Sequence, residues 1–422
     1  MEMLHCTIHP CRETIRPLFA HHSCAVRPVI SLERYATLLG QPALRSVIVA
    51  SVLGRMPIGI TGLAILMLTQ DTTGSFASGG LAASCYVAGL AAVAPLLGRL
   101  IDRYGPRHTL RVCAFGFPSA LAALVAALAV PVPLPIACVL ATAAGASFPP
   151  ITVCMRTFFK HRLKDDALLA TAYSLESVVI EMIFIVGPVL VALFVALASP
   201  AAAVLFAAAC GCAGTLLFQR SHALTQWKIE PRGASSLFGP LAEPGFLPLL
   251  AVIVCYASAF GLVEIGTTAY ATERGGPALA GVLLGIMSIG SAAGGLVYGS
   301  RSWYLPLARQ FPLTLCLMGM GIAPLALLTP VWAFGIWCVA AGIVMAPALI
   351  MQAMLVAKIA RAEQSTEAFT WSSTGLLAGV GFGLSAGGAL LEYARSPAVF
   401  AAAAALSIAA GVLALRLVRV RG

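Results

Sequence analysis

Charged residues are scarce in this sequence of 422 residues: Lys and Arg number 26, Asp and Glu number 16, and together they make up 10% of the chain. Soluble domains carry about 25% charged residues. A water-soluble fold of this size could not cover its surface with so few charges, because 60% of the residues are hydrophobic. The scarcity therefore excludes a soluble globular protein and indicates that lipid surrounds much of the surface.

Several chemical signatures are missing as well. No glycine-rich loop for phosphate binding occurs, which argues against ATP-driven transport. The twelve cysteines show neither a disulfide framework nor zinc-finger spacing. The histidines lie in the N-terminal segment or in predicted loops, as His108, His161 and His222 do, so no catalytic cluster supports a membrane-embedded enzyme. We expect no cofactor and no metal.

Long apolar runs fill the chain instead. A helix needs about 20 apolar residues to cross a bilayer core of about 30 Å. The runs are continuous and show no alternation, which disfavours membrane β-strands. Twelve runs qualify: 43–69, 77–100, 108–130, 133–156, 167–198, 200–219, 246–271, 277–300, 305–328, 331–357, 366–392 and 396–417. The sequence therefore predicts an all-α membrane protein with twelve transmembrane helices.

The basic residues predict the orientation. With the N-terminus inside, the outer loops hold only Arg274 and Arg395, Arg55 lies within a span, and the other Lys and Arg residues are cytoplasmic. This asymmetry places both termini in the cytoplasm. The net charge of +10 thus belongs to loops at a membrane and not to a nucleic-acid surface. The compact loops suggest a bacterial inner membrane.

A polar segment divides the chain into two halves. Residues 220–245 are rich in Pro, Gly and Ser, as linkers are, and follow the sixth span. We therefore predict a six-helix bundle over 43–219, a cytoplasmic linker over 220–245 and a second six-helix bundle over 246–422. Two parallel six-helix halves are the layout of a secondary transporter.

Residues 1–42 form the N-terminal segment. They include four His and three Cys within the first 24 residues, which raises the alternative of a metal site. The spacing fits no standard zinc finger, and the segment lacks the apolar core of a signal peptide. We expect a disordered tail, or extra residues that come from an upstream start codon.

The loop between spans two and three, "GRLIDRYGPR" at 98–107, concentrates charge between two apolar runs. Gly98 allows close helix approach, and Asp102 can accept hydrogen bonds from the N-terminus of a neighbouring helix. Arg103 and Arg107 can pair with Asp102 and with lipid phosphate.

This pattern of Gly98, Asp102, Arg103, Gly105 and Arg107 resembles the signature loop of the major facilitator superfamily. The resemblance implies the two-bundle fold of that family and a conformational latch that holds the halves together on the inside. The alternative is that these charges only anchor the loop in the cytoplasm. The corresponding loop of the second half, 294–303, keeps Gly295 and Gly299 but has no acid, so we expect a one-sided latch.

Four ionisable residues fall within predicted spans: Arg55, Glu176, Glu181 and Glu264. Such groups are costly in lipid and mark functional sites. Arg55 and Glu181 lie roughly 18 and 21 Å along their helices, near the middle of the membrane. Arg55 could bind an anionic substrate group, set the protonation of a nearby Glu, or form a structural ion pair with a carboxylate of its own half.

The three acids receive different predictions. Glu181 shares a face with Ser177 and Pro188, and a desolvated carboxylate can exchange protons near neutral pH, so Glu181 is the candidate for proton coupling. Glu176 lies about 140° around the helix from Glu181 and faces elsewhere. Glu264 could face Arg55 across the cavity or bond within its own half.

Further residues complete the predicted site. Gln352, Trp371 and Ser372 are candidates to line the cavity, whereas Arg156 and Lys160, at the end of span four, look like cytoplasmic anchors.

Together these features predict a monomeric secondary active transporter that moves a small molecule by alternating access, with the proton as coupling ion. Few charges in the spans suit amphipathic compounds and favour efflux. An uptake permease or a facilitator of the same fold stays open, as do an embedded enzyme and a receptor.

Overall fold

The computed structural model describes residues 33–419 apart from 131, 222–223, 225–226, 228–238 and 275–276. The described residues are almost entirely helical and include no strand, which confirms the all-α fold. The His- and Cys-rich part of the N-terminal segment and most of the 220–245 linker lie outside the described residues.

Two bundles of helices follow one another along the chain. The first contains α2 (Pro42–Arg55), α3 (Pro57–Thr73), α4 (Phe76–Tyr104), α5 (Pro106–Leu128), α6 (Leu134–Ala146), α7 (Ile151–Arg162), α8 (Asp166–Leu197) and α9 (Pro200–Arg220). The second contains α11 (Phe246–Arg274), α12 (Pro277–Ser300), α13 (Leu307–Ile322), α14 (Val331–Gly342), α15 (Met345–Ile359), α16 (Ser365–Tyr393) and α17 (Ser396–Arg419).

The predicted spans all have helical counterparts. Eleven stretches within the described residues are long and apolar enough to cross a membrane. The remaining predicted span corresponds to α13, which has 16 residues and continues into a short 3-10 turn. The fold is therefore consistent with twelve transmembrane helices.

Three spans are each built from two helices. Span one breaks between Arg55 and Pro57, and span four breaks before α7 at Pro149 and Pro150. Proline lacks the N–H that would continue a helix and clashes with the preceding turn. Span ten also breaks, after Gly342, between α14 and α15, although the two residues of this break are not prolines. The break in span one leaves Arg55 at the last position of α2, and the break in span four places Arg156 in the middle of the short helix α7.

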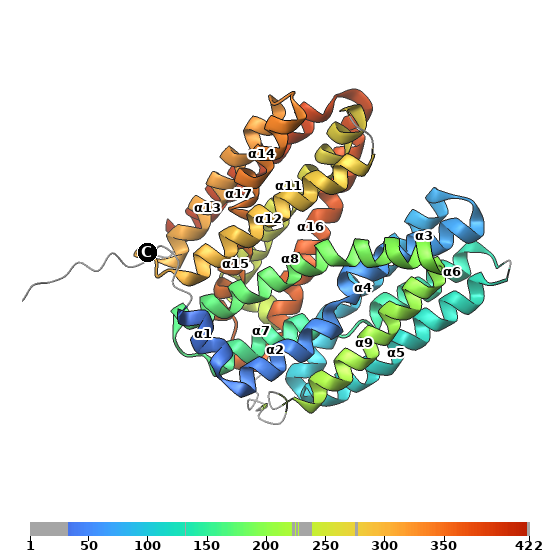
Figure 1. Cartoon of the computed structure of the whole chain (residues 1–422). Coiled ribbons are helices and arrows are strands. Elements are labelled where there is room, and N and C mark those ends of the chain that lie inside the picture. Colours follow the sequence, from blue (N-terminus) through green and yellow to red (C-terminus); the bar gives the residue numbers. More distant parts are fainter. Residues whose placement is uncertain are drawn as a thin grey trace, which may run out of the picture.

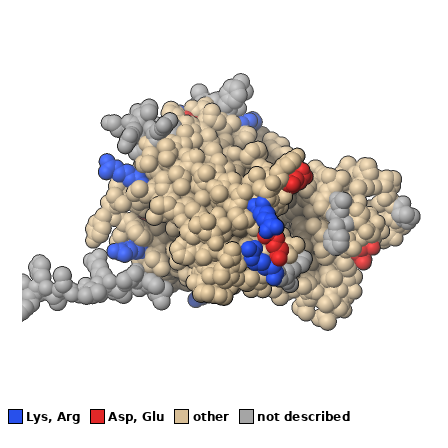
Figure 2. Space-filling view, turned by 90° about the horizontal axis from the view of Figure 1, so that it is seen from above, with Lys and Arg blue, Asp and Glu red and all other residues tan. Residues whose placement is uncertain are grey.

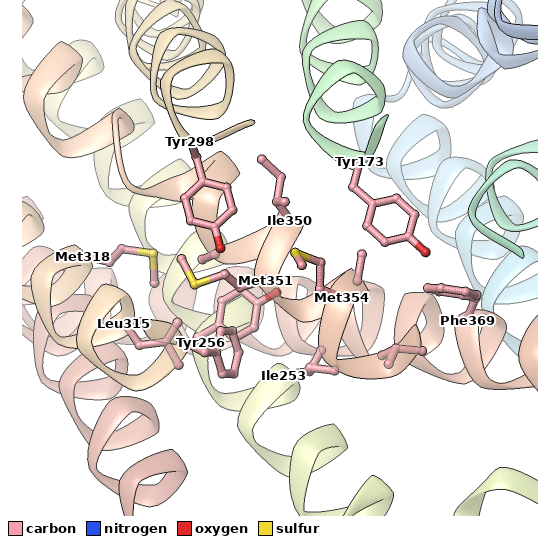
Figure 3. Packing of buried hydrophobic residues seen from close by; sticks show 14 of the residues in the cluster. Tyr173, Ile253, Tyr256, Tyr298, Leu315, Met318, Ile350, Met351, Met354 and Phe369 are labelled. Carbon is pink, nitrogen blue, oxygen red and sulfur yellow. The ribbon is translucent and has the colours of Figure 1, made fainter. Parts of the chain in front are cut away.

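The two bundles meet at one end and diverge at the other (Figure 1). One cluster of buried hydrophobic residues includes Tyr173 of α8 together with Tyr256 and Phe369 of the second bundle, and the Tyr173 and Phe369 rings are 6.2 Å apart (Figure 3). A separate cluster around Ile60 and Phe117 belongs to the first bundle alone. The bundles therefore share a core at one end and part from each other at the other.

We call the joined end the basic end, because the α4–α5 and α7–α8 connections with their arginines and lysines lie there, and the other end the open end. Seen from above, the surface carries very few charged side chains (Figure 2).

The sequence suggested that residues 1–42 are disordered, but the last part of this segment is helical. Residues Glu33–Gly40 form a short helix, α1, in which Tyr35 and Leu38 are buried. The Tyr35 hydroxyl lies 2.7 Å from Ser174 Oγ of α8 and donates to the Leu296 carbonyl of α12 at 3.1 Å. Tyr35 orders this part of the tail because it bonds to both bundles at once.

Candidate functional site

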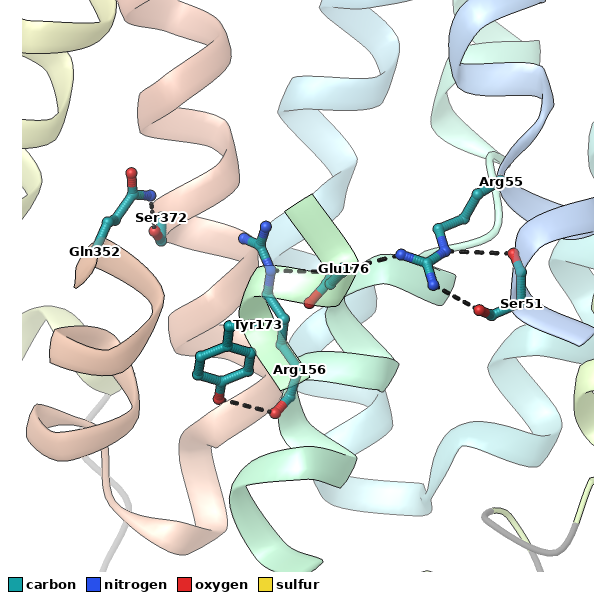
Figure 4. Close-up of polar contacts among 7 residues, drawn as sticks. All are labelled: Ser51, Arg55, Arg156, Tyr173, Glu176, Gln352 and Ser372. Carbon is teal, nitrogen blue, oxygen red and sulfur yellow. Dashed lines mark hydrogen bonds and ion pairs between the residues drawn. The ribbon is translucent and has the colours of Figure 1, made fainter. Parts of the chain in front are cut away.

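A buried charge cluster joins three spans of the first bundle (Figure 4). Glu176 of α8 accepts a hydrogen bond from Arg156 Nε of α7 at 3.2 Å, and its same oxygen, Oε1, lies 3.6 Å from Arg55 Nη1 of α2. Arg55 is 1% exposed and Glu176 is 3% exposed. The cluster is thus one carboxylate between two guanidinium groups, with little contact to solvent.

Local bonds hold both arginines in place. Arg55 folds back along α2, where Nη2 donates to Ser51 Oγ at 2.5 Å and Nε donates to the Ser51 carbonyl at 3.3 Å. Tyr173, one helical turn before Glu176, donates its hydroxyl to the Arg156 carbonyl at 3.1 Å. The Ser51 bonds fix the direction of the Arg55 guanidinium, whereas the Tyr173 bond ties the backbone of α7 at Arg156 to α8.

The structure shows which acid pairs with Arg55, a point that the sequence left open. Arg55 pairs with Glu176, and Glu181 faces a different helix. Arg156 and Lys160, which the sequence suggests are cytoplasmic anchors, both have specific partners within the protein. Arg156 is paired inside the bundle, and Lys160 donates to the Ala360 carbonyl and to Ser365 Oγ of the second bundle. The position of Arg156, six residues before the end of α7, was the signal for a deeper role.

The cluster is not electrically balanced. Two guanidinium groups face one carboxylate. Both guanidinium groups are positively charged, because arginine is not deprotonated in proteins. Within the described part of the chain, Glu176 Oε2 and Arg55 Nη1 have no hydrogen-bond partner. The group therefore carries a net positive charge in a region from which water is largely excluded.

Polar residues of the second bundle lie across from Arg156 (Figure 4). Gln352 of α15 is 2% exposed and donates from Nε2 to Ser372 Oγ of α16 at 2.6 Å. Its Oε1 accepts a hydrogen bond from the Tyr256 hydroxyl of α11. Trp371 is half-buried, and its indole N–H has no acceptor among the described residues. Gln352 and Ser372 thus form a buried polar pair in the second bundle, and their role as cavity-lining residues stays a prediction together with that of Trp371.

Glu264 does not join the cluster. It lies on α11 with an exposed side chain, and no ion pair within the described residues involves it. The expectation that it faces Arg55 is not met, because Arg55 is enclosed by its own bundle and already directed at Glu176.

Glu181 lies at a contact between the bundles. Ser291 of α12 donates to Glu181 Oε1 at 2.7 Å. The carboxylate is half-buried, and its half-turn offset from Glu176 aims it at the second bundle. A change in the protonation of Glu181 would therefore act directly on a bond between the two halves.

The loop 98–107 makes the α4–α16 contact at the basic end. Asp102 accepts hydrogen bonds from the backbone N–H groups of Thr366 and Glu367 at 3.0 and 2.8 Å, in the first turn of α16. A Cβ atom at Gly98 would lie 2.9 Å from the Cα atom of Glu367, so only glycine permits this approach. Gly105 has a φ of +81°, which also favours glycine.

The basic residues of the loop behave differently from the expectation. Within the described chain, Arg103 and Arg107 form no ion pair with Asp102; both are exposed, and Arg103 lies over the Tyr104 ring at 5.1 Å. Arg99, which was not singled out from the sequence, instead bonds through Nη2 to Glu367 Oε1 at 2.6 Å. Asp102 does not need an arginine as its partner, because the backbone N–H groups at the N-terminus of α16 donate to its carboxylate.

We expect Asp102→Asn to loosen the basic end. Asparagine keeps one acceptor but loses the charge and turns an amide N–H₂ toward a backbone N–H. The loss of about 1–2 kcal/mol corresponds to roughly a tenfold shift toward the state with separated bundles. Maleimide labelling of Thr370→Cys, a buried position against Gly98, should rise accordingly in a background without other reactive cysteines. Arg107→Gln removes a charge from the same loop without touching α16. Equal labelling in both variants would reduce the loop to a charge anchor.

The second contact at the basic end, between α8 and α12, uses other means. Ser174 Oγ donates to the Gly295 carbonyl and Thr171 Oγ1 to the Gly299 carbonyl, each at 2.6 Å. The loop of the second half has no acid that could cap α8. Instead Asp165, the N-cap residue of α8, accepts hydrogen bonds from the backbone N–H groups of Ala167 and Leu168. The missing acid is thereby replaced locally.

No metal site is evident in the described ranges, because no group of three or more His, Cys, Asp or Glu side chains is placed to hold an ion. The histidines and cysteines before residue 33 lie outside those ranges.

Comparisons with known proteins agree with this geometry. The Major Facilitator Superfamily profile matches residues 47–306, more than half of the chain. A comparison with curated proteins gives no match. Among solved structures, a bacterial homologue of the iron transporter ferroportin in an outward-facing state is similar with a TM-score of 0.73 and 13% identity, over 89% of this chain and 99% of that one.

Two further structures are similar. The human organic anion transporter MFSD10 has a TM-score of 0.70 and 17% identity, over 89% of this chain and 100% of that one. The proton:xylose symporter XylE, bound to 6-bromo-6-deoxy-D-glucose, has a TM-score of 0.66 and 12% identity, over 88% and 94%. At these identities the likeness concerns the fold.

Proposed function

This chain belongs to the major facilitator superfamily, and we propose that it is a proton-coupled exporter of amphipathic small molecules in a bacterial inner membrane. The family and its fold make the chain a membrane transporter that works by alternating access, and not an enzyme. Proton coupling, outward direction, cytoplasmic termini and a monomeric state are the parts that we add.

The observation that carries the proposal is the carboxylate at the contact between the bundles. Glu181 accepts from Ser291 across the α8–α12 contact, so gain or loss of a proton changes a bond between the two bundles, which we expect to break when the bundles move apart. A ligand or proton shifts a conformational equilibrium only through such differential contacts. Glu181 is therefore the coupling residue in our proposal.

Two features support the direction and the orientation. The distribution of Lys and Arg favours a cytoplasmic basic end, together with both termini and the 220–245 linker. In that orientation the described state opens outward, since the bundles diverge at the other end (Figure 1). Apart from the buried charge cluster of Arg55, Arg156 and Glu176, which we call the central cluster, the spans contain few charged residues. Such spans suit an amphipathic substrate.

The test is a screen of labelled amphipathic compounds in proteoliposomes with an imposed pH gradient. Protons leave a liposome with an acidic lumen, so an antiporter accumulates its substrate in that lumen, and a protonophore abolishes the accumulation. Accumulation in a liposome with a basic lumen would instead identify an uptake symporter. Equal levels regardless of the gradient would identify a facilitator.

A further inference from the structure

The charge of the central cluster calls for an anion. Arg55 and Arg156 remain charged at any physiological pH, and Glu176 contributes one negative charge. Protonation of Glu176 would increase the net charge. Transfer of an unbalanced charge out of water is costly, so buried charges are normally paired. The cluster therefore lacks one negative charge.

The other acids of the membrane region do not supply that charge. Glu181 points about 140° away from Glu176 on α8 and bonds to Ser291 of α12. Glu264 is exposed on α11. Within the described residues, neither acid forms an ion pair with Arg55 or Arg156. No acid among the described residues therefore supplies the missing negative charge, and a bound anion could supply it.

Only one of the two arginines can be reached by a ligand. The space beside Arg55 and Glu176, lined by Met155 and Phe159, is too small for a water molecule. The Arg156 side chain is 14% exposed, against 2% for Arg55. Arg55 is therefore sealed inside the bundle, whereas Arg156 forms the accessible edge of the cluster.

The free end of Arg156 has the geometry of an anion ligand. Its Nε atom is bonded to Glu176, while its two Nη groups have no acceptor among the described residues and lie on the side away from Glu176, with the Gln352–Ser372 pair across from Arg156 (Figure 4). Two parallel N–H donors of a guanidinium match the two oxygens of a carboxylate or sulfonate.

We propose that the two Nη groups of Arg156 bind an acidic group of the cargo, a carboxylate or a sulfonate, between the two bundles. Arg55 and Glu176 are positioning residues that hold Arg156 in this orientation. The inference rests on the transporter function proposed above, but it concerns binding, which requires no gradient and no direction of transport.

The experiment measures binding to the purified full-length protein by titration calorimetry at constant ionic strength. The probes are benzenesulfonate and benzoate, each compared with its neutral counterpart, benzenesulfonamide and benzamide. We expect each anion to bind more tightly than its neutral counterpart. Arg156→Gln should weaken anion binding about tenfold or more and leave the neutral compounds unchanged, because it removes charge-assisted hydrogen bonds.

The variants are chosen so that folding does not decide the result. Arg156→Gln leaves a balanced Arg55–Glu176 pair, so we expect it to fold. Arg156→Lys keeps the charge without the two parallel donors and should give intermediate binding. Arg301→Gln, an exposed arginine over the Trp303 ring, is the matched control and should bind like the parent protein.

Three results would overturn the proposal. They are equal binding of the anions and their neutral counterparts, anion binding that survives Arg156→Gln, and displacement of the organic anions by equimolar chloride, which would indicate a resident inorganic ion. A protein that binds the anions but fails in the gradient assay would leave this inference standing and refute proton coupling alone.

Discussion

Glu176→Gln is expected to prevent the accumulation of folded protein. The substitution removes the one carboxylate that faces Arg55 and Arg156 and leaves two unpaired guanidinium groups within one buried cluster. Removal of one partner from a buried ion pair costs about 3–5 kcal/mol, a large share of the stability of an ordinary domain. We expect a strongly lowered unfolding midpoint in detergent and loss of the monodisperse peak in size-exclusion chromatography.

Glu181→Gln is the matched control for this loss. It makes the same substitution on the same helix, five residues further on, but Glu181 has a serine and not an arginine as its partner. A glutamine oxygen can still accept the Ser291 hydrogen bond, although without the strengthening that a carboxylate charge gives. An unfolding midpoint that falls equally in both variants, or in neither, would contradict the structural role of Glu176.

For transport, the largest effect is expected from Glu181→Gln. Glutamine cannot exchange a proton, so the variant should still bind its substrate and exchange substrate for substrate, while accumulation driven by a pH gradient is lost. One pH unit is worth about 1.4 kcal/mol per proton, which supports about a tenfold concentration ratio. The measurement is the ratio of lumenal to external substrate in proteoliposomes with an acidic lumen.

The control for this prediction is Glu264→Gln, which removes an exposed acid from the other bundle. Full accumulation with Glu181→Gln and none with Glu264→Gln would move the coupling site to α11. Accumulation retained in both variants would indicate another coupling ion or a facilitator. Glu176→Gln is unsuitable as a transport control, because its expected effect on folding would mask any effect on coupling.

Several features of this protein follow from the sequence by itself. The twelve spans were predictable because hydropathy adds up along a segment and does not depend on what packs against it. The break of span one at Pro57 follows from the missing N–H of proline. The glycines and Asp102 of the loop 98–107 could be assigned to a close helix contact, because the required residue types are local: glycine for approach and an acid for a helix N-terminus.

Only the tertiary structure decided which distant groups meet. Asp102 is bound by backbone N–H groups more than 260 positions away, and Arg99, not Arg103 or Arg107, pairs with Glu367. Helical periodicity placed Glu176 away from Glu181 but did not show which helix it would face. The pairing of Glu176 with both Arg55 and Arg156 depends on how three spans pack, and packing is a property of facing surfaces that no single segment encodes.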